Sequence, residues 1–256
     1  MKTLNNVIKF TSPGNFDKWE QECQPIGNAY MGASFFGGIR KEKVVLNEKT
    51  LWTGGPSDNF PEYCGGNKPD SYPYVKEVQR LLYEGRYNEA LEVLPKLTGY
   101  DKGSGAYQLL CNLYIEQEVD ESGASDYIRR LDMDKALFTT EFTSEGVRYV
   151  REAFANYPSN VICLRLSASE PKALNIKFYL GEIQEGGRVR AESSCIKYSG
   201  EIPDNKLRYA AELRFESDGE IKAENGAVEI SEASRAVVYL TASTDYSPLF
   251  SDKYRN

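Results

Sequence analysis

The stretch Leu174-Asn175-Ile176-Lys177-Phe178-Tyr179-Leu180 decides the fold class, because Leu, Ile and Phe alternate along it with Asn, Lys and Tyr. The stretch Leu207-Arg208-Tyr209-Ala210-Ala211-Glu212-Leu213-Arg214-Phe215 alternates in the same way. A period of two residues places successive side chains on opposite faces of a β-strand. Both stretches therefore predict strands that bury one face and expose the other to water.

Turn signals separate the predicted strands from Lys135 onward. They are Ser144-Glu145-Gly146, Glu170-Pro171, Asp218-Gly219 and Asn225-Gly226. Glycine supplies the positive φ that tight hairpin turns need, and Asn and Asp tolerate the same region. A strand about every ten residues favours an antiparallel sandwich over a parallel α/β sheet.

One segment, residues 72–94, has a helical period instead. Its apolar residues recur at intervals of three and four, which is typical of a helix with one buried face. Ser71 is the expected N-cap, Pro73 lies in the first turn, and Gly85 is expected to divide the segment into two short helices. The apolar positions are Val75, Val78, Leu81, Leu82, Tyr87, Ala90, Leu91 and Leu94.

Composition excludes several partners. The chain has 256 residues, a formal charge of −7 and a pI near 5.0, and it has no cluster of Lys and Arg, so we expect no nucleic-acid partner. No segment approaches the ~18 apolar residues of a membrane span. The N-terminus lacks the apolar region of a signal peptide. As it stands the sequence predicts a cytoplasmic protein, or a secreted one if a signal peptide was removed.

The His and Cys content limits the kinds of catalytic and metal site that the chain can form. The chain contains no His, which excludes Ser-His-Asp triads and His metal sites. Its five cysteines show no C-x-x-C spacing, so we expect scattered reduced thiols, no metal site and no cofactor. The cysteines are Cys23, Cys64, Cys111, Cys163 and Cys195.

Two glycine-containing blocks combine polar and aromatic residues in a way that a turn alone does not need. They are Pro25-Ile26-Gly27-Asn28-Ala29-Tyr30-Met31-Gly32 and Leu46-Asn47-Glu48-Lys49-Thr50-Leu51-Trp52-Thr53-Gly54-Gly55-Pro56. The glycines and Asn28 are explained equally well as structural turns. Asn47, Glu48 and Trp52 are candidates for contact with a sugar or with another domain, because an indole face is a suitable platform for sugar C–H groups.

These blocks resemble the N-terminal domain of glycoside hydrolase family 95, a family of bacterial and plant α-L-fucosidases. Its members read approximately P-I-G-N-G-R-M-G-A and then N-E-x-T-L-W-S-G-G-P. The segment 107–113 is similar to the family's Y-Q-P-L-G-D-L block: Tyr107 and Gln108 match, whereas Leu109 replaces Pro and Asn112 replaces Asp. The segment 243–246 is similar to the segment through which the family's β-domain leads into a linker. The resemblance covers nearly the whole chain but only about the first quarter of a typical family member.

The resemblance implies an all-β fold, an antiparallel β-super-sandwich with a short helical insertion near residues 72–94. Residues 1–246 would form this N-terminal domain, and residues 247–256 would begin the linker to a helical (α/α)6 catalytic barrel that the sequence does not include. The family's catalytic Glu, Asp and Asn lie on the barrel, so we expect no catalytic residue in this chain. The pocket or interface candidates are Asn47, Glu48, Trp52, Tyr107 and Gln108.

The implied parent is an inverting α-L-fucosidase that removes terminal α-L-fucose from oligosaccharides. The isolated chain is then expected to be inactive, to brace the barrel and to lend a loop to its pocket. Trp52, Leu51, Phe60 and Tyr246 are expected to be exposed where the barrel docks. Three alternatives remain open: a related α-L-galactosidase, a free-standing carbohydrate-binding module, and an autonomous enzyme that uses carboxylates among Glu48, Asp58, Glu62 and Asp101.

Overall fold

The computed structural model describes residues 6–55, 66, 68–99, 105–182 and 184–247. The chain divides into two compact units. The first comprises Met1–Leu51, Leu109–Glu201 and Arg208–Asn256, and the second comprises Trp52–Gln108 and Ile202–Leu207.

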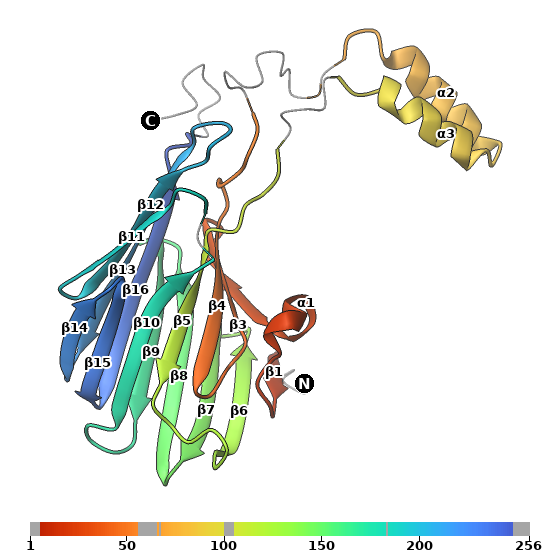
Figure 1. The fold of residues 1–256 in the computed structure, drawn as a ribbon. Helices are drawn as coiled ribbons and strands as arrows, with labels where there is room; N and C mark the ends of the chain where they lie inside the picture. Colours follow the sequence, from red (N-terminus) through yellow and green to blue (C-terminus); the bar gives the residue numbers. More distant parts are fainter. Residues whose placement is uncertain (1–5, 56–65, 67, 100–104, 183, 248–256) are drawn as a thin grey trace. The chain divides into compact units, whose positions relative to one another are not determined.

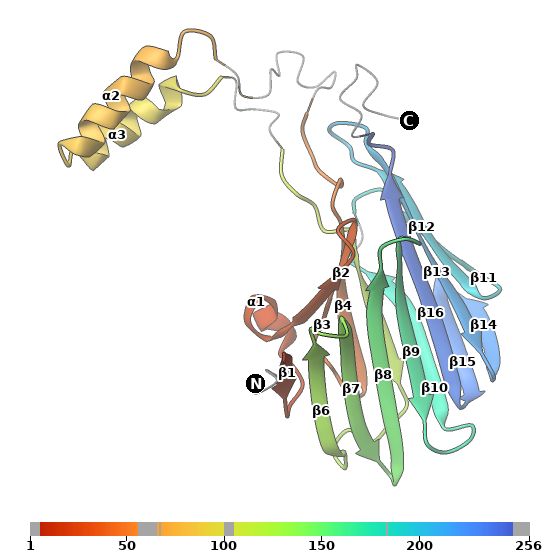
Figure 2. The same cartoon turned by 180° about the vertical axis from the view of Figure 1, so that it is seen from behind.

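The first unit contains two antiparallel sheets (Figure 1). The nine-stranded sheet has the order β1-β6-β7-β8-β9-β16-β13-β12-β11, and the seven-stranded sheet has the order β14-β15-β10-β5-β4-β3-β2. Turning the view by 180° brings β6, β7 and β8 to the front (Figure 2). The fold class predicted from the sequence is therefore confirmed: the unit is an all-β sandwich of two large sheets.

The strand bounds are as follows. The nine-stranded sheet consists of β1 (Val7–Phe10), β6 (Ser125–Asp132), β7 (Leu137–Ser144), β8 (Val147–Asn156), β9 (Val161–Ala168), β11 (Arg188–Glu192), β12 (Cys195–Glu201), β13 (Arg208–Ser217) and β16 (Arg235–Thr244). The seven-stranded sheet consists of β2 (Gln24–Gly27), β3 (Met31–Phe35), β4 (Lys41–Glu48), β5 (Cys111–Gln117), β10 (Leu174–Gly181), β14 (Glu220–Glu224) and β15 (Ala227–Ala233). The short helices η1 (Phe16–Lys18) and α1 (Trp19–Glu22) precede β2.

The core lies between the two sheets and contains the residues that the alternation predicted. Ile176 and Phe178 on β10 are buried, and so are Leu213 and Phe215 on β13. The rings of Phe178 and Phe215 lie 4.9 Å apart between their centroids and join the seven-stranded sheet to the nine-stranded sheet. Truncating one such Phe to Ala typically costs 3–5 kcal/mol, so contacts of this kind hold the sheets together.

The turns lie where the sequence placed them. Asn225 and Gly226 have φ values of 51° and 78° and connect β14 to β15, as a two-residue hairpin turn requires. Glu145 and Gly146, with φ values of 49° and 79°, connect β7 to β8 in the same way.

The second unit contains the predicted helical segment. It consists of α2 (Tyr72–Tyr83), α3 (Tyr87–Val93) and the 3-10 turn η2 (Leu94–Lys96). Gly85 interrupts the helices at φ 72°, as expected. Ser71 is the N-cap residue of α2, as predicted, although its side chain makes no capping hydrogen bond. No helix among the described residues has the length and apolar character needed to cross a membrane.

A buried polar cluster joins the two sheets near the connection between β3 and β4. The guanidinium of Arg151 on β8 donates to the carbonyl oxygens of Gly38 (2.5 Å) and Ile39 (2.6 Å) and to Oε1 of Gln117 on β5 (2.8 Å). Arg151 is only 6% exposed. One side chain therefore satisfies three buried acceptors that belong to the opposite sheet and its connection.

Glu42 completes this cluster. Its carboxylate is buried and accepts the backbone N–H of Phe36 (2.9 Å). Burial raises the pKa of Glu42 to about 7, although the nearby Arg151 charge and backbone N–H groups of the connection act in the opposite direction. Gly37 in this connection has φ 71°, and a Cβ there would collide with the hydroxyl of Tyr127. The connection thus depends on glycine as well as on the buried charges.

Candidate functional site

Asn28 fixes the turn between β2 and β3. Its Oδ1 accepts the backbone N–H groups of Tyr30 (3.0 Å) and Met31 (2.8 Å). Its Nδ2 donates to the carbonyl oxygen of Asn156 at the end of β8 (3.0 Å) and to Oδ1 of Asn160 in the β8–β9 connection (3.1 Å), both in the other sheet. All four of these hydrogen bonds of the Asn28 side chain are to other groups of the same chain. The Gly-Asn block therefore has the structural role of joining the two sheets.

Glu48 has a similar role at the end of β4. It is 4% exposed, and its Oε2 accepts both the backbone N–H and the hydroxyl of Thr50, each at 2.7 Å. The Thr50 hydroxyl in turn meets the hydroxyl of Thr244 at the end of β16. This carboxylate holds the turn that follows β4 and is almost completely buried.

Asn47 does not join Glu48 in one site. The two residues are adjacent on β4, where successive side chains point to opposite faces of the sheet. Asn47 is half-buried and lies opposite Gly32 of β3. The two adjacent candidates therefore lie on opposite faces of the sheet.

Trp52, Tyr107 and Gln108 are brought together in the second unit. Trp52 and Tyr107 form an isolated antiparallel bridge, and their ring centroids lie 5.5 Å apart. Both rings remain substantially exposed, at 46% and 42%. The Gln108 side chain donates to the carbonyl oxygens of Ala106 (3.0 Å) and Tyr107 (3.2 Å). Trp52 and Tyr107 thus form an aromatic platform, and the adjacent Gln108 side chain bonds to its backbone.

The segment 202–207 holds this platform in place. The side-chain amide of Asn205 donates to the carbonyl oxygens of Trp52 (2.9 Å) and Gly54 (2.7 Å), and the backbone N–H of Gly54 donates to Asp204 (2.8 Å). Asn205 is 6% exposed. Sequence reasoning missed Asp204 and Asn205, because they read as an ordinary turn about 150 residues away from Trp52. Side chains of this segment therefore hold the backbone at Trp52 and Gly54.

The expected docking residues have different environments. Trp52 and Tyr246 are exposed, the latter at 43%. Leu51 is completely buried, so the expectation of exposure is wrong for it. Its backbone N–H donates to the Glu48 carbonyl oxygen (3.2 Å) within the turn after β4, which keeps Leu51 with the sandwich core. Phe60 lies outside the described residues.

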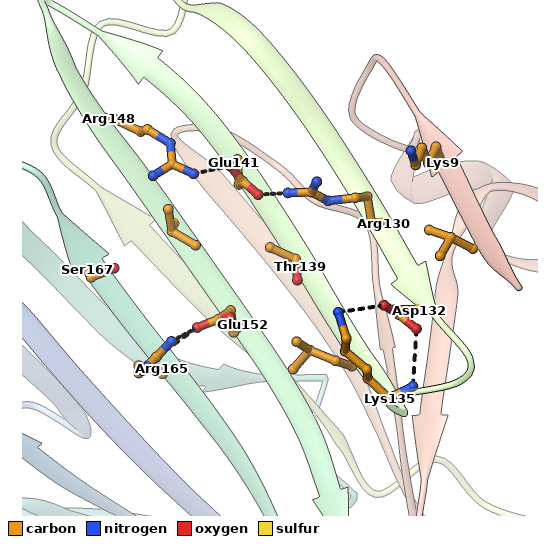
Figure 3. Close-up of a pocket in the computed structure, with 13 residues that line it drawn as sticks. Lys9, Arg130, Asp132, Lys135, Thr139, Glu141, Arg148, Glu152, Arg165 and Ser167 are labelled. Atoms are coloured by element: carbon orange, nitrogen blue, oxygen red, sulfur yellow. Dashed lines mark hydrogen bonds and ion pairs between the residues drawn. The ribbon is translucent and has the colours of Figure 1, made fainter. Parts of the chain in front are cut away.

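The outward face of the nine-stranded sheet carries an open groove of about 590 Å³ (Figure 3). Its carboxylates are engaged by cations: Glu141 contacts Arg130 and Arg148, and Glu152 contacts Arg165. Asp132 lies 3.2 Å from the ammonium group of Lys135. Each of these three carboxylates is therefore in contact with at least one cation.

The described residues contain no group of three or more His, Cys, Asp or Glu side chains that could hold a metal ion. Glu42 is the described carboxyl group whose pKa burial raises, and it is enclosed by backbone and core. Of the carboxylates that an autonomous enzyme could use, Glu48 is buried against Thr50, and Asp58, Glu62 and Asp101 lie outside the described residues.

Three comparisons place this chain among known proteins. The family model described as "Glycosyl hydrolase family 65, N-terminal domain" matches residues 8–249. The "Alpha-L-fucosidase 2" of Arabidopsis thaliana is 27% identical over 96% of this chain, and the "Probable alpha-fucosidase A" of Aspergillus niger is 35% identical over 62% of it. The chain spans only 31% and 19% of the lengths of these two relatives.

A solved structure described as "Putative kojibiose phosphorylase from human microbiome" shares the fold. Its TM-score is 0.52 at 14% identity, and the match covers 94% of this chain and 34% of that one. The recognition of a glycoside hydrolase N-terminal domain, made from the motifs around Asn28 and Trp52, is thereby confirmed. The chain belongs to the family of glycosyl hydrolase family 65 N-terminal domains, and its named relatives are α-fucosidases.

Proposed function

We propose that this chain is the non-catalytic N-terminal domain of an inverting α-L-fucosidase that releases terminal α-L-fucose from oligosaccharides. One observation carries the proposal: nearly the whole chain matches α-fucosidases that are about three times as long, as the 31% coverage of the Arabidopsis protein indicates. The remainder of such a protein has room for a separate catalytic domain, which we take to be the helical barrel of the same polypeptide.

The chemistry of the described residues supports a non-catalytic role. An inverting glycosidase needs two carboxyl groups roughly 6.5–9.5 Å apart, one of them protonated at the working pH. The carboxylates in the groove are paired with Arg or Lys, and Glu48 is occupied by Thr50. Glu42 has a raised pKa but no access to a substrate. We therefore assign the acid and base to the barrel.

The aromatic platform is the part of this chain that we assign to the substrate pocket. The side chains of Trp52 and Tyr107 are exposed, and Asn205 holds the backbone at Trp52. A pre-ordered ring costs less entropy on binding than a mobile one. In this proposal the platform walls the sugar pocket of the barrel, while the sandwich braces it.

We expect no hydrolysis of 4-nitrophenyl α-L-fucoside or 2′-fucosyllactose by the isolated chain, because the described residues offer no exposed acid–base pair. Release of 4-nitrophenol and of fucose would be measured with the full-length protein as the positive control. The corresponding α-L-galactoside distinguishes a fucosidase from a related α-L-galactosidase. Turnover by the isolated chain that Glu48→Gln abolishes would show an autonomous enzyme and refute the proposal.

Replacing Trp52 with Ala is expected to change the free energy of unfolding of the isolated chain by no more than about 1.5 kcal/mol, the scale of one exposed aromatic pair. The same change should lower the fucosidase activity of the full-length protein at least tenfold. Trp19→Ala is the matched control, because Trp19 is 52% exposed and lies outside the platform. A larger loss of stability would make Trp52 a core residue, and unchanged activity would remove it from the pocket.

A free-standing carbohydrate-binding module is the second candidate, favoured by the exposed Trp52–Tyr107 pair. It predicts that the isolated chain binds fucosylated oligosaccharides by itself and that Trp52→Ala abolishes this binding. The proposed hydrolase domain predicts instead that fucose binding requires the barrel. Calorimetric titration of both forms with 2′-fucosyllactose separates the two functions.

A further inference from the structure

The groove of Figure 3 is positively charged, although the chain as a whole carries a formal charge of −7. It contains five basic and three acidic side chains. They come from β1, β6, β7, β8, β9 and the β6–β7 connection, all within the first unit. A local excess of positive charge on an acidic protein favours an anionic ligand at that place.

The excess lies at one end of the groove. Glu141 contacts both Arg130 and Arg148, so one carboxylate faces two guanidinium groups. Lys9 lies directly across from Arg130 in the β1–β6 register, and it has no ion pair among the described residues. This end of the groove therefore has three cations and one carboxylate. The other charges are matched, Asp132 with Lys135 and Glu152 with Arg165.

The opposite end continues into an apolar hollow of about 330 Å³ that shares Leu137, Glu152 and Arg165 with the groove. Phe154, Cys163 and Tyr239 are paired residues on β8, β9 and β16, so they form a row across this face. Phe154 is 42% exposed and Tyr239 is 38% exposed. Aromatic rings on the wet face of a sheet provide flat apolar contact area with little entropy to lose.

We propose that this face binds an acidic oligosaccharide. Its sugar rings lie on Phe154 and Tyr239, and its carboxylate or sulfate groups contact Lys9, Arg130 and Arg148. The guanidinium fork makes strong charge-assisted hydrogen bonds to such oxyanions. That the ligand is a saccharide rests on the proposed function, whereas the expected negative charge of the ligand rests on the cations of the groove. A long polyanion is disfavoured because the net charge of the whole chain would repel it.

The test uses the isolated chain and four probes of matched length: a tetragalacturonate, a sulfated tetrasaccharide, a neutral tetrasaccharide and a tetraglutamate peptide. Isothermal titration calorimetry is expected to show at least tenfold tighter binding of one acidic saccharide than of the neutral one. The two acidic probes distinguish a carboxylate from a sulfate. Raising the salt from 50 to 500 mM should weaken this binding, because the charges are exposed.

Variants assign the binding to the groove. The double substitution Lys9→Ala and Arg148→Ala is expected to lower the affinity for the acidic saccharide at least tenfold. Tyr239→Ala should lower this affinity by a similar factor. Lys172→Ala is the charge control, because Lys172 pairs with Glu232 on an exposed surface outside the groove. Tyr83→Ala is the aromatic control, since Tyr83 is 94% exposed. Circular dichroism verifies that each variant is folded.

Several results would overturn this inference: equal binding of the neutral and acidic saccharides, equal binding of tetraglutamate, no binding at all, or no effect of the groove variants. The α-L-fucosidase activity of the full-length protein on neutral 2′-fucosyllactose is measured in parallel. If the groove binds no acidic saccharide but the full-length protein hydrolyses 2′-fucosyllactose, only the proposed groove site is refuted. Absence of fucosidase activity refutes the proposed function, whatever the groove binds.

Discussion

Replacing Arg151 with Met is expected to lower the free energy of unfolding of the isolated chain by about 3–5 kcal/mol, the usual cost of removing one partner from a buried charged cluster. Arg151 supplies the hydrogen bonds to Gly38, Ile39 and Gln117, and all three acceptors belong to the sheet opposite its own strand. Each buried acceptor left without a donor costs about 1–3 kcal/mol. Denaturant melts monitored by tryptophan fluorescence measure the loss.

Arg214→Met on β13 is the matched control, because the Arg214 side chain is 73% exposed and pairs with Glu212 at the surface. We expect its free energy of unfolding to change by no more than about 0.5 kcal/mol. Equal effects of the two substitutions would show that the buried cluster does not hold the sheets together. An increase in stability with Met at position 151 would contradict the argument more strongly, since Met would then be preferred to the buried cation.

The fold was predictable from local patterns. Alternation in the stretches that became β10 and β13, and turn residues such as Asn225-Gly226, report directly on the backbone conformation. The helices α2 and α3 were predicted for the same reason, because their apolar period is a local property. The N-cap position of Ser71 was predicted correctly, but the absence of a capping hydrogen bond from its side chain was not predictable, because that bond depends on one side-chain rotamer.

The candidate site was predicted only in part. Trp52, Tyr107 and Gln108 are together, but Asn47 and Glu48 lie on opposite faces of β4. The motif identified important residues without revealing that a buried carboxylate at position 48 serves the backbone of Thr50. A sequence motif records which residue types occur, whereas accessibility depends on tertiary packing.

Long-range partners could not be predicted. Asn205 is separated from Trp52 by 153 positions, and Arg151 is separated from Gly38 by 113. In the sequence of β8, Arg151 looks like the exposed Arg148 until the register assigns it to the inner face opposite Thr140. The groove was missed for a related reason, since the register of several strands, including the distant β1 with Lys9, brings its cations to one face.

The buried carboxyl group of Glu42 is expected to make the isolated chain less stable as the pH rises from 5 to 8. Burial raises its pKa from 4.5 to about 7 in the folded state. Below pH 4.5 both the folded and the unfolded chain hold this proton. Between pH 4.5 and 7 the folded chain binds more protons than the unfolded chain, so the free energy of unfolding falls with increasing pH.

The expected loss from this group is roughly 3 kcal/mol between pH 5 and pH 8, because each unit of pKa difference corresponds to about 1.4 kcal/mol. Glu42→Gln keeps the shape of the side chain but removes the titration. Denaturant melts of both proteins at pH 5 and pH 8 should therefore show a drop that is larger for the wild type. Since all other carboxyl groups are common to both proteins, the difference isolates position 42. If the wild type instead gains stability relative to Glu42→Gln as the pH rises, Arg151 and the backbone N–H groups outweigh burial, and Glu42 is ionised in the folded protein.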